Sequence, residues 1–380
     1  MLIKNGLVYL PNGDFTFQDI LIEGERIVAM EENLPSTGQE VIDAHRLYVL
    51  PGLIDIHLHG CMGVDFSDCY LEDLHKLAAA ELAWGVTAFC PASMTLPEEE
   101  LAESFRTAAQ FQATPKEATL LGINMEGPFL AASKLGAQNQ DYLTLPDVAM
   151  FRRLQEQAQG LIKLVDIAPE LDGALDFIKA VKKEVHISLA HTAASYTKAE
   201  AAFKAGADHL THLYNAMTPF THRHPGIIGA ASDNEKVMAE LICDGIHNHP
   251  SAVRAAFKLF GAERLVLISD SMEACGLPDG EYFLGDQEVT VKGKYARLSG
   301  THTIAGSVAN LAECWQWAVI VAGIPMAQAL RCATLNPAKS IGMEKDYGSL
   351  AVGKYADIIL YDNAYHLVKV IKHGCEAYSY

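Results

Sequence analysis

The sequence has little positive charge: 29 Lys and Arg residues stand against 47 Asp and Glu residues, and the formal net charge is −18. No block rich in Lys or Arg interrupts this acidic composition. These features argue against binding of nucleic acid or of an anionic membrane surface. They leave room for a small anionic substrate, because such a ligand needs only one or two local cations.

Long apolar runs and paired cysteines are also missing. No stretch reaches the roughly 18 apolar residues of a membrane-spanning helix, so none is expected. The first residues do not combine a charged region, an apolar core and a cleavage site, so no secretion signal is expected. The eight cysteines are scattered and form no Cys-x-x-Cys pair, a pattern typical of reduced thiols. We therefore expect a cytoplasmic protein.

What the sequence does contain is a large apolar fraction. Half of its 380 residues are hydrophobic and 29 are glycine, which is typical of a globular α/β protein. Residues 1–50 resemble short strands joined by turns, with hairpin signals at Asn5-Gly6 and Asn12-Gly13. The C-terminal segment has the same pattern of short strands and turns, and neither segment alone can bury a hydrophobic core. We expect residues 1–50 and 345–380 to form one small β-sandwich domain.

Strand-like and helix-like segments alternate between these two ends. Counting from Leu53 gives eight strands, most of them followed by a helix, which is the pattern of a (β/α)₈ TIM-like barrel over residues 51–344. A doubly wound open sheet is the alternative, but no G-x-G-x-x-G follows the first strand. Residues 276–300 have the character of an inserted β excursion. The predicted helices span residues 71–84, 97–112, 146–159, 171–183, 197–205 and 251–260.

Two histidines close the first strand of the predicted barrel. The short apolar run from Leu47 to Ile56 is typical of a strand buried on both faces, and His57-Leu58-His59 follows it directly. Residues two apart in a strand point to the same face, so the two imidazoles leave the strand side by side, about 7 Å apart. Because neutral imidazole is the commonest metal ligand, this pair predicts a metal site. Ordinary loop hydrogen bonding is the alternative.

Four further apolar segments end in a side chain that can bind a metal. The four side chains are those of Glu126, His191, His212 and Asp270. In a (β/α)₈ barrel the carboxyl ends of the strands form one mouth, where the chemistry takes place. We therefore expect these four residues to meet His57 and His59 there.

Six nitrogen and oxygen ligands without a thiolate suit Zn²⁺, with Fe²⁺, Mn²⁺ and Co²⁺ as alternatives. Either two ions share the six ligands or one residue is left for proton transfer, and Asp270 is the natural free carboxylate. A metal lowers the pKa of bound water to about 7, and a carboxylate beside it can pass the proton to a leaving amine. The expected reaction is metal-assisted hydrolysis of an amide or related C–N bond. A structural zinc site is disfavoured because such sites are usually closed and cysteine-rich.

Over nearly its whole length the sequence resembles the amidohydrolase superfamily and, within it, the deacetylases of phosphorylated amino sugars. Glu126-Gly127-Pro128 and the heptapeptide at 211–217 are highly specific to these deacetylases, whereas His-x-His after Pro-Gly is general to the superfamily. The resemblance implies hydrolysis of N-acetylglucosamine 6-phosphate to glucosamine 6-phosphate and acetate. The segments that carry it are residues 51–60, 125–129, 190–192, 211–217, 244–247, 269–271 and 298–301.

The resemblance also implies roles for individual residues. Glu126, His191 and His212 hold the main metal, His57 and His59 add a second, and Asp270 is the general base and acid. Some family members have other residues in place of His57 and His59 and use one ion, so the presence of both implies two ions per chain, with Glu126 bridging in place of the carboxylated lysine found elsewhere in the superfamily. Arg223 reaches the sugar phosphate, often from the neighbouring subunit, which implies a homodimer. The residues implied to line the sugar site are Ala137, Gln138, Asn215, Ala216, His247, Leu298, Ser299 and Gly300.

One position departs from the family pattern. Many relatives have a histidine where Gln138 follows Gly136-Ala137, and an amide can hydrogen-bond a sugar or phosphate without supplying charge. The galactosamine isomer of the substrate stays open as an alternative. A cyclic amidase or dipeptidase is a second one, although no lysine takes the place of Glu126. A metal-binding scaffold without activity is a third, although Asp270 is present.

Overall fold

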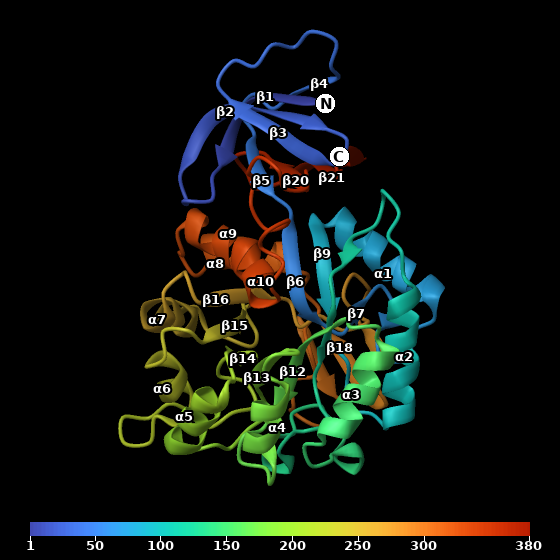
Figure 1. Ribbon diagram of the computed structural model, residues 1–380, viewed down its shortest axis with the longest axis vertical. Coiled ribbons are helices and arrows are strands. Elements are labelled where there is room, and N and C mark those ends of the chain that lie inside the picture. Colours follow the sequence, from blue (N-terminus) through green and yellow to red (C-terminus); the bar gives the residue numbers. More distant parts are fainter.

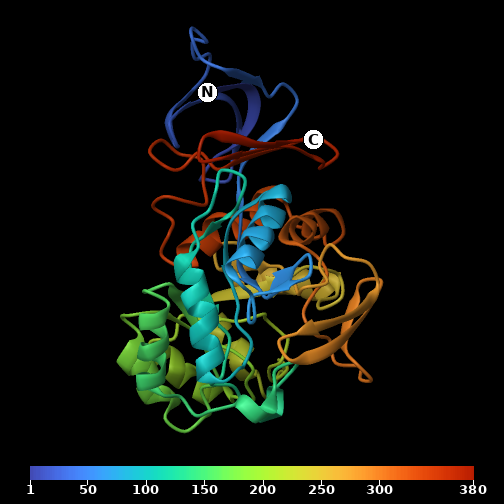
Figure 2. The same cartoon turned by 90° about the vertical axis from the view of Figure 1, so that its right-hand side faces the viewer.

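The computed structural model describes all 380 residues. Both ends of the chain contribute to one sheet, with the strand order β22-β21-β20-β5-β1-β2-β3 and with β4 paired to β1. The sheet folds into two layers, the N-terminal strands lying above the C-terminal ones (Figure 2), and residues such as Ile20 and Ile358 form an apolar core between them. Its strands are β1 (Leu2–Tyr9), β2 (Phe15–Glu23), β3 (Arg26–Glu31), β4 (Val41–Asp43), β5 (Tyr48–Pro51), β20 (Ile358–Tyr361), β21 (Leu367–Lys372) and β22 (Cys375–Ser379).

The rest of the chain forms the predicted barrel of parallel strands surrounded by helices (Figure 1). A bridge between Ala92 and Asn124 joins its two sheets at one seam. At the other seam the backbone N–H of Asp270 donates to the carbonyl of His57 at 2.9 Å. The barrel strands are β6 (Leu53–Leu58), β9 (Val86–Pro91), β10 (Thr119–Leu120), β11 (Ile123–Met125), β12 (Ile162–Ile167), β13 (His186–Leu189), β14 (His209–Leu210), β15 (Met238–Ile242) and β16 (Leu265–Ile268). Strands β10 and β11 together take the place of the one strand predicted between Thr119 and Met125.

The six predicted helices are all present, with boundaries explained by local chemistry. Helix α2 begins after Pro97, and three glutamates in its first turn suit the positive end of the helix dipole. Helix α4 begins at Ala174, later than predicted, because Gly173 has a φ of +83° and ends the preceding turn. The six are α1 (Leu71–Ala83), α2 (Glu98–Gln110), α3 (Val148–Gln157), α4 (Ala174–Val181), α5 (Tyr196–Ala205) and α7 (Pro250–Phe260).

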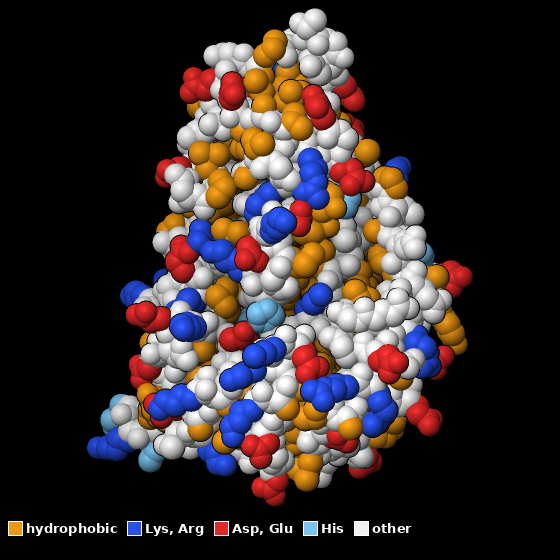
Figure 3. Space-filling view, in the orientation of Figure 1, with side chains coloured by type: hydrophobic (Ala, Val, Ile, Leu, Met, Phe, Trp, Pro, Cys, Tyr) orange, Lys and Arg blue, Asp and Glu red, His pale blue; other side chains and the backbone are white.

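The predicted β excursion at 276–300 is present as a three-stranded antiparallel sheet. A short hairpin after the first barrel strand was not predicted. No helix is long and apolar enough to cross a bilayer. The face in Figure 3 mixes acidic and basic side chains over the whole barrel. The additional elements are β7 (Gly60–Cys61), β8 (Val64–Asp65), α6 (Gly226–Ser232), β17 (Gly280–Leu284), β18 (Gln287–Lys292), β19 (Tyr295–Leu298), α8 (Leu311–Ile320), α9 (Met326–Ala333) and α10 (Leu335–Ser340).

Candidate functional site

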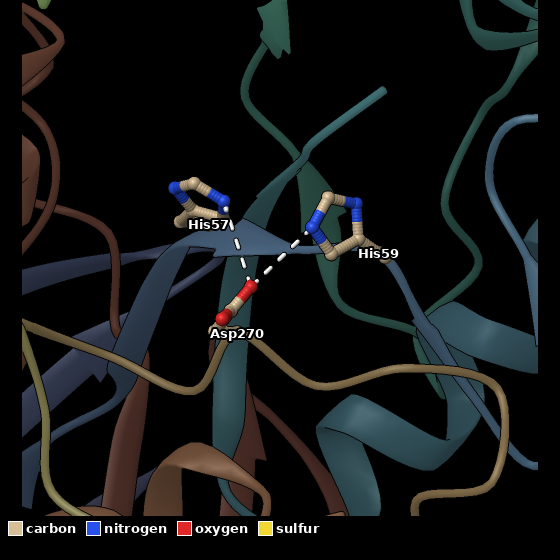
Figure 4. Close-up of side chains that lie close together, drawn as sticks. All are labelled: His57, His59 and Asp270. Atoms are coloured by element: carbon tan, nitrogen blue, oxygen red, sulfur yellow. Dashed lines mark ion pairs between the residues drawn. The ribbon is translucent and has the colours of Figure 1, made fainter. Parts of the chain in front are cut away.

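The six side chains singled out in the sequence meet at the carboxyl ends of the barrel strands, in two clusters. The first contains His57 of β6, His59 directly after it, and Asp270, two residues beyond β16. Asp270 Oδ1 lies 3.3 Å from His59 Nε2 and 3.7 Å from His57 Nε2, and Figure 4 shows both rings turned toward this carboxylate. All three residues are buried.

The second cluster is formed by Glu126, His191 and His212. The Nε2 atoms of the two histidines each lie 3.1 Å from Glu126 Oε1 and 3.1 Å from one another. Glu126 also faces the first cluster, with Oε1 3.5 Å from His57 Nε2 and Oε2 3.4 Å from His59 Nε2. The carboxylate of Glu126 therefore lies between the two histidine pairs.

The backbone at three of these positions adopts an uncommon conformation. His191, His212 and Asp270 have φ values of +41°, +26° and +51°, in a region that residues other than glycine rarely occupy. Each follows its strand by two residues, so the turn out of the strand points the side chain back over the mouth. Such conformations cost on the order of 1–3 kcal/mol each and cluster at functional sites.

Hydrogen bonds on the outer side of the rings fix their orientation. His59 Nδ1 lies 3.2 Å from the carbonyl of Ala92, and His191 Nδ1 lies 2.8 Å from the carbonyl of Lys134. A carbonyl oxygen only accepts, so in the neutral form of either ring the proton is on Nδ1 and Nε2 presents a lone pair to the centre. Metal-binding histidines commonly have this arrangement.

The donor set fits a divalent cation. Two imidazole nitrogens 3.1 Å apart share one carboxylate oxygen, and the buried Nε2 of His57 has no hydrogen-bond partner at all. A cation between these atoms would satisfy the unpartnered nitrogen. No cysteine belongs to either cluster, and nitrogen and oxygen ligands suit Zn²⁺ and related ions.

The electrostatics of the two carboxylates also favour cation binding. Burial alone would raise the pKa of Glu126, but the adjacent imidazoles of His57, His191 and His212 lower it well below its usual range. Burial likewise opposes ionisation of Asp270, yet the hydrogen bond to His59 and the nearby imidazoles lower its pKa. Both groups are therefore anionic at neutral pH and present negative charge to the centre.

A cavity of about 330 Å³ opens onto the clusters. Five of the residues implied to bind the sugar line it: Ala137, Gln138, Asn215, Ala216 and His247. Asp244 orients His247 by accepting a hydrogen bond from its Nδ1 at 2.7 Å. Gln138 has a second contact, because its Nε2 donates to Glu126 Oε2 at 2.5 Å while its Oε1 accepts from the backbone N–H of Thr95. The amide thus contacts the central carboxylate as well as the cavity.

Four implied substrate residues do not line this cavity. Leu298 ends β19, and the Ser299 hydroxyl lies 3.0 Å from that of Thr290 on β18, so this stretch contacts the excursion sheet and, with Gly300, does not line the cavity. Arg223 is exposed on the loop before α6, which protrudes from the barrel in Figure 1. Basic and histidine side chains gather on that protrusion in Figure 3. The roles of these four residues stay predictions.

The sequence argument missed other residues of the site. The segment that follows the excursion crosses the mouth of the barrel. Because the excursion comes after Asp270 in the sequence, this crossing could have been predicted. Asp166 lies inside the barrel within ligand range of His57 and Glu126, and Glu240 contacts His57. Both lie within strands, whereas only residues at strand ends were predicted as ligands. The missed lining residues are Met94, Leu284, His302, Thr303, Ile304 and Gly306.

Comparison with known proteins gives a consistent result. The N-acetylglucosamine-6-phosphate deacetylase of Bacillus subtilis (strain 168) is 36% identical over 378 residues, covering 98% of this chain and 93% of that protein. The N-acetylgalactosamine-6-phosphate deacetylase of Escherichia coli O157:H7 is 35% identical over 350 residues, 92% of each chain. A mutant N-acetyl-D-glucosamine-6-phosphate deacetylase from Mycobacterium smegmatis, solved in complex with N-acetyl-D-glucosamine-6-phosphate, superposes with a TM-score of 0.93 at 32% identity, covering 100% of this chain and 99% of that one.

The family model described as "Amidohydrolase family" matches residues 48–376. The matched region contains all six side chains of the two clusters. The resemblance found in the sequence is thereby confirmed, and this chain belongs to the amidohydrolase family.

Proposed function

We propose that this protein hydrolyses the N-acetyl group of N-acetylglucosamine 6-phosphate, releasing glucosamine 6-phosphate and acetate. The observation that carries the proposal is the convergence of the two clusters, joined by Glu126, on a cavity of about 330 Å³ at the barrel mouth. The B. subtilis and M. smegmatis relatives, which bear the name of this activity, support the choice of substrate.

Two divalent ions fit the donor set. Glu126, His191 and His212 would hold one, and His57 and His59 the other, with Glu126 shared between them. Zn²⁺ is our first choice because of the imidazole and carboxylate ligands, with Fe²⁺, Mn²⁺ and Co²⁺ as alternatives. When bound, the ions acidify water and polarise the amide carbonyl under attack.

Asp270 is placed to move the proton. Its carboxylate faces His59 on one side, and Oδ2 lies 3.9 Å from His247 Nε2 on the cavity side. In the proposed reaction it accepts a proton from the attacking water and delivers that proton to the nitrogen of the breaking C–N bond. The lowered pKa of Asp270 supports the first step, because the group must be ionised before it can accept a proton.

The phosphate would be bound by Arg223 of a second copy of the chain. Arg223 lies on an exposed loop away from its own cavity, so a contribution to its own site would require that loop to fold back. A guanidinium suits the geometry of a phosphate. We therefore propose a homodimer, and a cytoplasmic location is supported by eight free cysteines.

Acetate release separates the competing functions. We expect rapid release from N-acetylglucosamine 6-phosphate, slow release from the unphosphorylated sugar, and loss of both after chelation. The 4-epimer is the second candidate, since the E. coli relative is named for it, and faster release from N-acetylgalactosamine 6-phosphate would replace the proposed substrate. Hydrolysis of a cyclic amide or dipeptide without acetate release from either sugar phosphate would contradict the proposal.

A further inference from the structure

Strand β15 contributes no side chain to either cluster, but its middle residue contacts both. Glu240 is fully buried and points into the barrel beneath the mouth. Its Oε2 lies 3.0 Å from His57 Nδ1 and accepts the backbone N–H of His212 at 3.2 Å. Its Oε1 lies 3.2 Å from His209 Nε2. The carboxylate of Glu240 therefore contacts both clusters: the Nδ1 side of the His57 ring in the first and the backbone of His212 in the second.

Two groups compete for Nδ1 of His57. The amide nitrogen of Asn124, 3.3 Å away, is a donor and would favour an imidazole with its proton on Nε2. That tautomer has no lone pair facing Glu126 and Asp270. Glu240 is an acceptor, and a hydrogen bond to a carboxylate is stronger than one between neutral groups. Glu240 therefore favours the tautomer with the proton on Nδ1 and the lone pair of Nε2 toward the cluster.

The contact with His212 has a different effect. His212 has a φ of +26°, so its backbone needs support from the surrounding structure. The hydrogen bond from its N–H to Glu240 holds the turn that aims its ring at Glu126. Loss of Glu240 would thus disturb the ring of one cluster and the backbone of the other.

We propose that Glu240 is a positioning residue that holds His57 with its lone pair toward the first cluster, and so controls metal binding by His57 and His59. The inference rests on the proposed function, because metal binding is part of that proposal. It adds a residue that touches neither substrate nor ion. Partners of this kind, one step removed from a metal, typically contribute 10- to 100-fold to metal affinity.

Three variants test the proposal. Glu240→Leu removes the acceptor while filling a similar volume, and Glu240→Gln keeps an oxygen that can accept from Nδ1. Glu81→Leu is the matched control, since Glu81 is equally buried but lies on α1 and belongs to neither cluster. The first readout is Zn²⁺ affinity by chelator competition, in which two ions give two steps. The second is the ¹⁵N shifts of the His57 ring in metal-free wild-type protein, recorded at a pH alkaline enough for the ring to be neutral and assigned by their absence in His57→Asn.

We expect Glu240→Leu to weaken one of the two Zn²⁺ steps about 10- to 100-fold. Glu240→Gln should recover part of that loss, and Glu81→Leu should bind Zn²⁺ as the wild type does. The proposal is overturned if Glu240→Leu binds both ions within about twofold of wild type, or if Glu81→Leu loses as much affinity. It is also overturned if the neutral His57 ring carries its proton on Nε2, a result that does not depend on whether Glu240→Leu folds.

Failure of the proposed function gives a different result. Wild-type protein that binds Zn²⁺ but releases no acetate from the phosphorylated sugar would contradict that function and leave the comparison of Glu240 variants valid. Wild-type protein that binds no Zn²⁺ would contradict both.

Discussion

Replacing Asp270 by Asn should abolish most of the catalysis and leave the fold intact. The change keeps the size of the side chain and one oxygen that can face His59 Nε2, 3.3 Å away in the wild type. It removes the negative charge and the ability to accept a proton. Because Asp270 follows β16 at the open end of the barrel and is not part of the apolar core, we expect little effect on stability.

The magnitude follows from the role of the carboxylate. General acid–base groups contribute about 10²–10⁴-fold, and each factor of ten corresponds to about 1.36 kcal/mol of activation free energy. We therefore expect kcat to fall at least 100-fold, a barrier increase of about 2.7 kcal/mol or more. The Glu126, His191 and His212 cluster does not include Asp270, so its ion should be retained.

The assay is acetate release from saturating N-acetylglucosamine 6-phosphate with excess Zn²⁺, which separates lost proton transfer from lost metal. Asp208→Asn is the matched control, because Asp208 directly precedes β14, at the opposite end of the barrel from the mouth. We expect this control to retain wild-type kcat. If Asp270→Asn keeps more than a tenth of the wild-type kcat, another residue is the base and the reasoning fails.

The remaining predictions concern metal, phosphate and pH. Elemental analysis of metal-replete wild-type protein should find close to two equivalents of metal per chain. The double variant His57→Asn, His59→Asn should contain only one. One equivalent in the wild type would contradict the two-ion proposal. Arg223→Ala should raise KM for the phosphorylated sugar about 10- to 150-fold, since a hydrogen bond to a charged group is worth about 1.5–3 kcal/mol. The slow reaction of the unphosphorylated sugar should not change. If the arginine acts across a dimer, mixing Arg223→Ala with Asp270→Asn protein should restore activity, because hybrid dimers contain one site with both residues intact. Equal loss on both sugars would mean that Arg223 supports the fold and not the phosphate. The hydrogen bond to Asp208 raises the pKa of His186, so this pair stabilises the fold below about pH 6.5 and the stabilisation disappears as the pH rises through the raised pKa. Both side chains are about 40% exposed. In urea unfolding, Asp208→Asn should therefore lower the free energy of unfolding by less than about 1 kcal/mol at pH 5.5 and leave it unchanged at pH 9. A loss of stability that persists at pH 9 would refute the assignment.

The strand-end ligands could be predicted because two local signals coincide there. An apolar run of four to six residues indicates a buried strand, and a His, Glu or Asp after it has no role in the core. Parallel strands in a barrel bring such residues together whatever their separation in sequence, as Asp55 and Ser269 illustrate with a hydrogen bond across 214 residues. The cluster membership of Glu126 and His212 thus follows from strand order alone.

Residues whose place depends on the course of a loop could not be predicted in this way. The stretch 298–300 was implied to line the sugar site, but a turn after β19 leaves it outside the cavity and brings Thr303 and Ile304 into the lining. Nothing in the composition of residues 298–304 distinguishes the two halves. The orientation of Gln138 toward Glu126 is equally hidden, because it depends on a contact with the backbone of Thr95.

Carboxylates in the middle of barrel strands are visible in the sequence as charged residues within apolar runs, but the sequence does not show which side chains they contact. Asp55, Asp166 and Glu240 each interrupt an apolar strand, and all three lie inside the barrel below the two clusters. Their ionisation differs because their neighbours differ. Burial raises the pKa of Asp55 to about 7, and burial together with the charge of Glu126 raises that of Asp166. Burial opposes ionisation of Glu240 too, but its contacts with the His57 and His209 rings lower its pKa to about 2.

Glu240, whose pKa is lowered, therefore contacts a histidine, whereas the pKa of each of its two neighbours in this layer is raised. A buried charge is stable only beside a partner, so the ionised member of the layer marks the position where a ring must be held. A charged residue within an apolar strand of a predicted barrel is thus a candidate for supporting the site. It becomes a specific candidate only when the closed barrel shows which strand-end side chain lies above it.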